Sequence, residues 1–197
     1  MSVEKTRTLY LGLDPKPFVV HYPVIRTEYC ANLSEPYRLW PQFTHIIFTS
    51  KTAVRYWPGP WDKELITIGS ATAAALKQKG YDSVVAKVAT QEGVIDLVSN
   101  LKGYFFLPRS RLARPVLTDY LKANNIPFYA LDLYDTVFQK LEPVPNLEDF
   151  DEIVFTSPST VDGFLKIYGR LPKTKKLTAI GPITNQYLNS WVAKIIA

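Results

Sequence analysis

Two stretches of the sequence place a threonine and a serine directly after a run of apolar residues. "IIFTSKTAV" spans residues 46–54 and "IVFTSPSTV" spans residues 153–161. Each apolar run is typical of a buried strand, and each serine precedes a predicted helix that its hydroxyl can cap. Thr49, Ser50 and Ser157 also stand beside helix N–H groups, which favour negatively charged ligands. Capping and ligand binding both remain open from the sequence.

A second pair of motifs recurs in the same order. "ITIGSATAAAL" and "TAIGPITNQYL" each end a predicted strand on glycine, and Thr72 and Thr184 follow three residues later. A tight turn with a hydroxyl at the helix start explains them without any further role. Neither loop has the GxGxxG or GxxxxGK[ST] pattern of nucleotide-phosphate binding, which disfavours NAD and ATP. Two different motifs repeated in one order predict two related units.

Other catalytic and metal-binding patterns are scarce. The sequence has no GxSxG elbow, and neither His21 nor His45 lies near a predicted nucleophile. The single cysteine, Cys30, cannot form an internal disulfide, and with two histidines it cannot complete a Cys/His zinc site. We therefore expect no metal and a reducing compartment, and an enzyme with this sequence would act chiefly by positioning its substrate.

Strand-like runs alternate with helical patterns along the chain. Strands are predicted at 8–13, 45–50, 64–69, 83–88, 103–108, 126–134, 151–157, 176–181 and 191–197. Helices are predicted at 70–80, 90–103, 113–125, 158–169 and 182–192. Continuous apolar strands alternating with helices indicate α/β domains with parallel sheets covered on both faces.

The C-terminal part of the chain holds too few strands for a sheet of its own, so we expect it to recruit strand 8–13. The predicted organisation is a discontinuous terminal domain, 1–18 plus 140–197, a middle domain, 28–130, and two linker strands, 19–27 and 131–139. Strand alternation puts Tyr134 on one side of the second linker strand with Asp132 and Thr136. Tyr134 is the candidate proton donor, although packing within the linker also accounts for it.

Composition limits the partners of the protein. The chain has 197 residues, of which 47% are hydrophobic, and its 23 basic and 18 acidic residues give a net charge of +5. The basic residues are scattered, so a small anionic ligand fits the charge better than a nucleic acid does. No run is long enough for a membrane span, and the N-terminus lacks the pattern of a signal peptide. We expect a cytoplasmic globular protein.

Together these motifs resemble the uroporphyrinogen-III synthase family of tetrapyrrole biosynthesis. The resemblance rests on the two FTS and two IG motifs, on "FFLPRSRLARPVLTDYLKANNIPF" and on "LYDT", which run from about residue 45 to 188 in the family's order. It implies two flavodoxin-like α/β domains joined by a two-stranded β linker. It also implies the cyclisation of hydroxymethylbilane, a linear tetrapyrrole, with loss of water and inversion of the terminal ring. No cofactor is implied.

The resemblance assigns roles to individual residues. Tyr134 falls on the family's linker tyrosine, which assists loss of the substrate hydroxyl, and Arg109 falls near a basic position that can pair with a carboxylate. The remaining binding positions are Thr49, Ser50, Lys51, Thr72, Ser157 and Thr184. Thr52 stands at the usual arginine position, and the terminal domain looks abbreviated.

Two further expectations concern partners and the competing function. We expect a monomer or weak dimer, with hydroxymethylbilane synthase as the upstream enzyme. The alternative function is a hinged binding module that closes on an anionic small molecule without transforming it.

Overall fold

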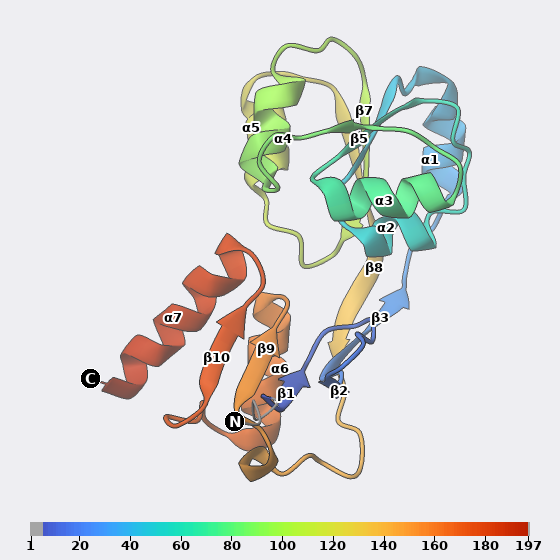
Figure 1. Ribbon diagram of the computed structural model, residues 1–197. Coiled ribbons are helices and arrows are strands. Elements are labelled where there is room, and N and C mark those ends of the chain that lie inside the picture. The colour runs from blue at the N-terminus through green and yellow to red at the C-terminus, as the bar shows by residue number, and fades with distance from the viewer. Residues whose placement is uncertain (1–5, 197) are drawn as a thin grey trace. The chain divides into compact units, whose positions relative to one another are not determined.

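The computed structural model describes residues 6–196. The chain forms two compact units: a terminal unit, Met1–Arg26 with Thr136–Ala197, and a middle unit, Thr27–Asp135. It passes between the units twice, within β3 (Ile25–Tyr29) and within β8 (Phe128–Phe138). Both units are α/β folds built on parallel strands, as the sequence predicts (Figure 1).

The middle unit is built on a sheet of order β3-β8-β7-β4-β5-β6, in which β8, β7, β4, β5 and β6 pair in parallel. Its remaining strands are β4 (His45–Phe48), β5 (Glu64–Thr67), β6 (Val84–Val85) and β7 (Phe105–Ser110). Its helices are α1 (Ser34–Leu39), the short 3₁₀ helix η1 (Trp40–Gln42), α2 (Lys51–Tyr56), α3 (Ser70–Gln78), α4 (Gln91–Val98) and α5 (Val116–Ala123).

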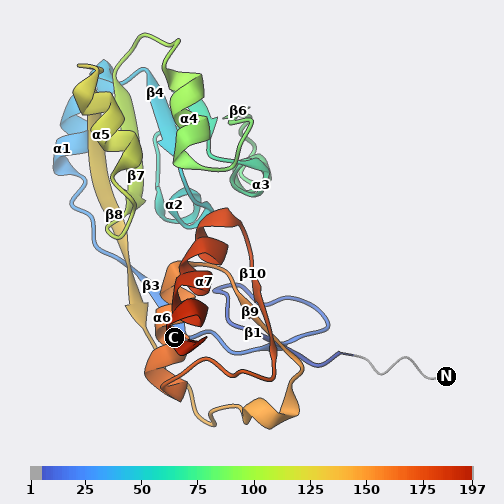
Figure 2. The ribbon, with the colours of Figure 1, turned by 90° about the vertical axis from the view of Figure 1, so that its left-hand side faces the viewer.

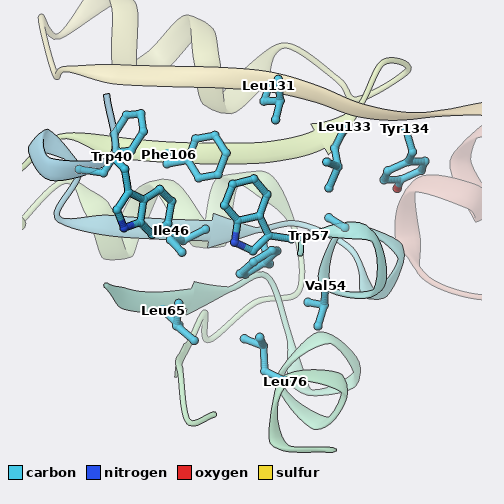
Figure 3. Close-up of a cluster of buried hydrophobic side chains, with 13 residues drawn as sticks. Trp40, Ile46, Val54, Trp57, Leu65, Leu76, Phe106, Leu131, Leu133 and Tyr134 are labelled. Carbon is cyan, nitrogen blue, oxygen red and sulfur yellow. The ribbon is translucent and has the colours of Figure 1, made fainter. Parts of the chain in front are cut away.

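Helices cover both faces of this sheet, because successive residues of a strand point to opposite sides. Ile46 and Phe48 of β4 pack with η1, α2 and α3, whereas Ile47 packs with α4 and α5. Figure 3 shows the first of these clusters, in which the rings of Trp40 and Trp57 stack at 5.6 Å. Burial on both sides explains why residues 46–48 of β4 form a continuous apolar run rather than an alternating one.

The terminal unit has a four-stranded parallel sheet of order β10-β9-β1-β2. Its elements are β1 (Thr8–Tyr10), β2 (Val20–His21), β9 (Glu152–Phe155), β10 (Lys176–Ala179), the 3₁₀ helix η2 (Leu147–Asp149), α6 (Pro158–Tyr168) and α7 (Pro182–Ile196). The N-terminal strand β1 lies between β9 and β2 in this sheet, and Figure 2 shows it beside β9.

One cluster of buried side chains holds the terminal unit together. Leu9, Ile153 and Phe155 of the strands pack against Phe164 of α6 and Leu188 of α7. The helix α6 ends at Tyr168 and is capped by Gly169, whose φ of +75° is the left-handed conformation that glycine adopts without strain.

Three predictions about elements are wrong or incomplete. The strand predicted at 191–197 is helical as far as Ile196, because α7 continues through this segment; residue 197 lies outside the described residues. The crossing strand predicted at 19–27 is divided into β2, which pairs with β1, and β3. The segment 34–42, for which no helix was predicted, forms α1 and η1.

The fourth difference concerns β8, where simple alternation fails. The register with β7 pairs Arg109 with Asp132 and then Ser110 with Tyr134, so Leu133 is the extra residue of a β-bulge. A bulge turns two consecutive side chains toward the same face. Tyr134 therefore packs with Leu131 and Leu133 and not on the side of Asp132, contrary to the prediction.

Candidate active site

The carboxyl end of β4 leads into the first FTS loop, where the predicted cap is confirmed. Ser50 has extended backbone, and its Oγ accepts a hydrogen bond of 3.0 Å from the N–H of Ala53 in the first turn of α2. Thr49 lines a small cavity together with Arg109 and Arg114. Lys51 is the first residue of α2 and is exposed.

Tyr134 comes within hydrogen-bonding distance of this loop. Its Oη lies 2.9 Å from the Oγ of Ser50. The hydroxyls of Thr52 and Ser110 also act on the phenol and lower its pKa. The bulge makes this possible, since it turns Tyr134 toward the face of the sheet on which α2 lies. The structure thus brings together two residues that are 84 positions apart in the sequence.

The surroundings of Tyr134 keep its phenol protonated. The residue is only 6% exposed, and burial, which disfavours the charged phenolate, is the main cause of the raised pKa of Tyr134. Hydrogen bonds from Ser50, Thr52 and Ser110 lower the pKa and oppose that effect only in part. At neutral pH the group is therefore a proton donor and not a base.

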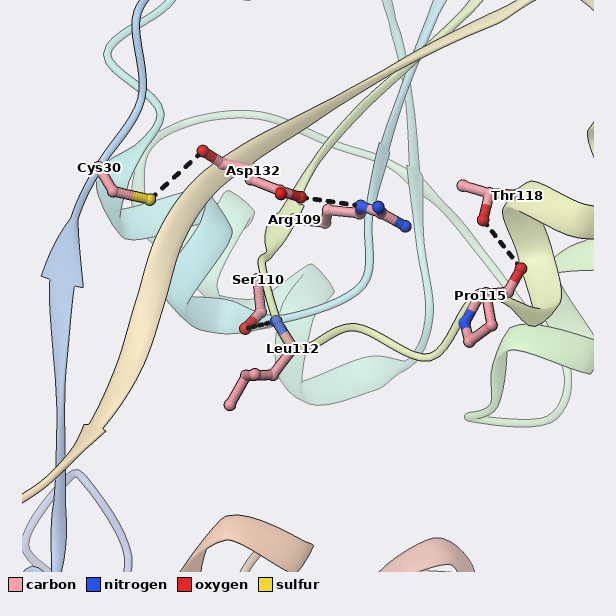
Figure 4. A network of polar contacts seen from close by, with 7 residues as sticks. All are labelled: Cys30, Arg109, Ser110, Leu112, Pro115, Thr118 and Asp132. Carbon is pink, nitrogen blue, oxygen red and sulfur yellow. Dashed lines mark hydrogen bonds and ion pairs between the residues drawn. The ribbon is translucent and has the colours of Figure 1, made fainter.

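Arg109 is paired within the protein. Its Nε donates to Oδ1 of Asp132 at 3.3 Å, and both side chains are partly exposed (Figure 4). This contact uses one of the five N–H donors of the guanidinium, so the two Nη groups remain available for a carboxylate.

The second motif of the middle unit is arranged differently. Gly69 is the N-cap of α3 and follows β5. A Cβ on Gly69 would stand 2.9 Å from Cβ of Ala89, so close packing accounts for the glycine. Thr72 is 4% exposed and its N–H donates to the carbonyl of Gly69 at 3.1 Å. The side chain of Thr72 thus belongs to the helix start and is buried there.

The terminal unit repeats this pattern at the carboxyl ends of β9 and β10. Ser157 caps α6 in a capping box: its Oγ accepts from the N–H of Thr160, whose own Oγ1 accepts from the N–H of Ser157. Gly181, with a φ of +84°, precedes α7, in which Thr184 is 4% exposed. The two FTS serines are therefore equivalent as caps, but Ser157 has no tyrosine at its Oγ among the contacts of the described residues.

Ser50, Thr52 and Ser110 form a hydroxyl cluster around Tyr134, and the sequence does not indicate the part that two of them play. Thr52 is distinguished in the sequence only by replacing an arginine, and nothing in "LPRS" indicates the bulge that sets Ser110 opposite Tyr134.

No group of three or more metal-ligating side chains occurs within residues 6–196. No helix in that same range is long and apolar enough to cross a membrane.

Comparison with known proteins places this arrangement in a family. The family model of uroporphyrinogen-III synthase HemD matches residues 18–197. A provisionally assigned uroporphyrinogen-III synthase of Methanothermobacter thermautotrophicus is 29% identical over an alignment of 187 positions. The alignment covers 81% of this chain and 74% of the relative.

Solved structures show the same fold. The uroporphyrinogen-III synthetase of Helicobacter pylori superposes with a TM-score of 0.68 at 18% identity, covering 94% of this chain and 88% of that one. A mutant uroporphyrinogen III synthase of Thermus thermophilus gives a TM-score of 0.63 at 19% identity, covering 95% and 89%. Because the family model spans nearly the whole sequence, the chain belongs to the uroporphyrinogen-III synthase family.

Proposed function

We propose that this protein is a cyclising hydro-lyase that converts hydroxymethylbilane to uroporphyrinogen III. The observation that carries the proposal is the protonated phenol of Tyr134, held at 2.9 Å from Ser50 at the end of a parallel strand. Loss of the terminal hydroxyl of the substrate as water needs a proton, and a neutral phenol can donate it.

The rest of the reaction depends on orientation. Departure of water leaves an azafulvene, which the substituted carbon of the terminal pyrrole attacks to give a spiro intermediate; fragmentation and reclosure then invert that ring. The substrate closes spontaneously to the uninverted isomer, so the protein must hold the terminal ring in the productive orientation. This is a geometric and entropic task that needs no second catalytic side chain.

Substrate carboxylates are proposed to bind at the strand ends. Lys51 and the Nη groups of Arg109 supply positive charge, and Thr49 and Ser157 supply hydroxyls, whereas the hydroxyl of Ser50 lies against Tyr134. Thr72 and Thr184 are buried, so we assign them to shaping their loops, whose backbone N–H groups are the binding groups. We further propose a cytoplasmic location, a monomer or weak dimer, and delivery of the substrate by hydroxymethylbilane synthase.

Analysis of the product tests this function. Purified protein is incubated with hydroxymethylbilane, the porphyrinogens are oxidised, and isomers I and III are separated. We expect isomer III to predominate, while a reaction without protein gives isomer I. If the protein binds the substrate yet only isomer I forms, the protein is a binding module and the enzymatic proposal is wrong.

A further inference from the structure

The β-bulge in β8 gives Tyr134 a partner that lies on the neighbouring strand. Ser110, the last residue of β7, is the register partner of Tyr134, and the N–H of Arg111 donates to the carbonyl of Tyr134 at 2.9 Å. The backbone thereby fixes Ser110 beside the tyrosine, where the Ser110 hydroxyl lowers the pKa of Tyr134.

The other contacts of the two serines leave each hydroxyl able to donate its hydrogen. Ser110 Oγ accepts from the N–H of Leu112 at 3.2 Å (Figure 4), and Ser50 Oγ accepts from the N–H of Ala53 at 3.0 Å. A hydroxyl has one hydrogen and two acceptor lone pairs. Each oxygen accepts from a backbone N–H through one lone pair, and its own hydrogen can be directed at the Oη of Tyr134 once that oxygen becomes a phenolate.

Two O–H donors aimed at one phenol oxygen suit the deprotonated form of that oxygen. Hydrogen bonds to a charged acceptor are stronger than those to a neutral one, so the pair gains strength as negative charge develops on Oη. Tyr134 is almost fully buried, where water cannot provide this solvation.

We propose that Ser110 is a positioning residue that acts with Ser50 to stabilise the Tyr134 phenolate while its proton resides on the substrate. The inference rests on the proposed function. In the step concerned, the O–H bond of Tyr134 breaks and its electron pair stays on Oη. The proton joins the substrate hydroxyl, the C–O bond breaks, and water leaves with that bond's electron pair. The phenolate regains a proton when the pyrrole carbon that forms the last ring-closing C–C bond loses its hydrogen.

A purely structural role for Ser110 is the competing explanation, since this residue also begins a turn. The hydrogen bond of this turn runs from the N–H of Ala113 to the backbone carbonyl of Ser110, so a substitution of the Ser110 side chain leaves it in place. Replacing Ser110 by alanine therefore removes only the Oγ contacts, and a threonine at this position restores the hydroxyl.

The decisive readout is the titration of one phenol. A single 3-fluorotyrosine is placed at position 134, and its ¹⁹F resonance is followed against pH in the otherwise unchanged chain and in Ser110→Ala, Ser110→Thr and Ser99→Ala. Ser99 is the matched control, because its Oγ donates to the backbone carbonyl of Asp96 at 3.1 Å. It caps α4, which packs on the opposite face of the sheet from Tyr134.

Loss of one donor to the phenolate should raise the pKa of the residue-134 phenol in Ser110→Ala by about one unit, since a hydrogen bond to the charged form lowers a pKa. In the natural chain the same substitution should lower kcat about tenfold and leave KM unchanged, because the bond strengthens only in the transition state. Ser110→Thr should restore both values, and Ser99→Ala should change neither.

The possible failures can be told apart. An unchanged titration in Ser110→Ala, with isomer III still formed, overturns the role of Ser110 and leaves the proposed function standing. A natural chain that yields only isomer I overturns the proposed function and with it the catalytic use of Ser110, whatever the titration shows. A raised pKa that Ser110→Thr does not reverse would make the effect one of packing and also overturn the inference.

Discussion

Replacing Tyr134 by phenylalanine removes a single oxygen from the hydroxyl cluster and tests the proposed proton donor directly. The ring should keep its packing, including the contact with Tyr56 at a centroid distance of 5.8 Å, because phenylalanine has the same shape. The backbone N–H bonds to Ser50 and Ser110 do not involve the phenol and should also persist.

The structural cost of this substitution should be small. The variant loses the hydrogen bonds of the phenol to neutral hydroxyls, and it leaves those hydroxyls without this partner. We expect the two effects together to lower the free energy of unfolding by about 1 kcal/mol. The catalytic cost should be larger, since general acid catalysis contributes at least about 100-fold. We therefore expect kcat to fall by about two orders of magnitude, or about 2.7 kcal/mol in activation free energy.

The assay is the initial rate of isomer III formation, measured alongside denaturant unfolding of the same preparation. Tyr56→Phe is the matched control, because the Oη of Tyr56 donates to the carbonyl of Thr27 at 2.8 Å and takes no part in the cluster. This control should lose comparable stability and keep its turnover. The pKa of Tyr134 is raised, so the natural enzyme should lose activity on the alkaline side only above about pH 10.

Two results would refute this reasoning. Turnover by Tyr134→Phe equal to that of the natural chain would return Tyr134 to a packing role. An equal loss of activity in Tyr56→Phe would mean that the fold near α2, and not the phenol proton, controls the rate.

Three further predictions concern the terminal unit. Ser157→Ala should cost this unit about 1 kcal/mol in denaturant unfolding because it removes a cap, and Ser157→Asn should recover most of that. The pKa of Glu152 is lowered, chiefly by the hydroxyl of Thr178. The contribution of Glu152 to folding stability is therefore present above the pKa of the unfolded state and is lost as pH falls through the pKa of the folded state. Glu152→Gln should flatten the acid side of a profile of stability against pH. Gly163→Ala should destabilise by about 1–3 kcal/mol in thermal unfolding, because its Cβ would lie 2.8 Å from Val24, and an unaltered midpoint would contradict that packing.

Much of the fold follows from local patterns in the sequence. Runs such as 46–48 and 153–155 are apolar because they lie in parallel strands, and the serines after them cap helices because of their position alone. Both features depend on neighbours a few residues away, which the sequence displays. The strand predicted at 191–197 fails for a related reason: a short apolar run suits either structure, and the helix α7 extends through it.

The sequence by itself determined the two α/β units, the helix caps and the choice of Tyr134 as candidate donor. Only the tertiary structure decided which way Tyr134 faces and what it contacts. One extra residue in β8 turns the phenol toward Ser50 and Ser110, which come from two other strand ends. A bulge is defined by pairing with a neighbouring strand, so no pattern within either strand alone reveals it.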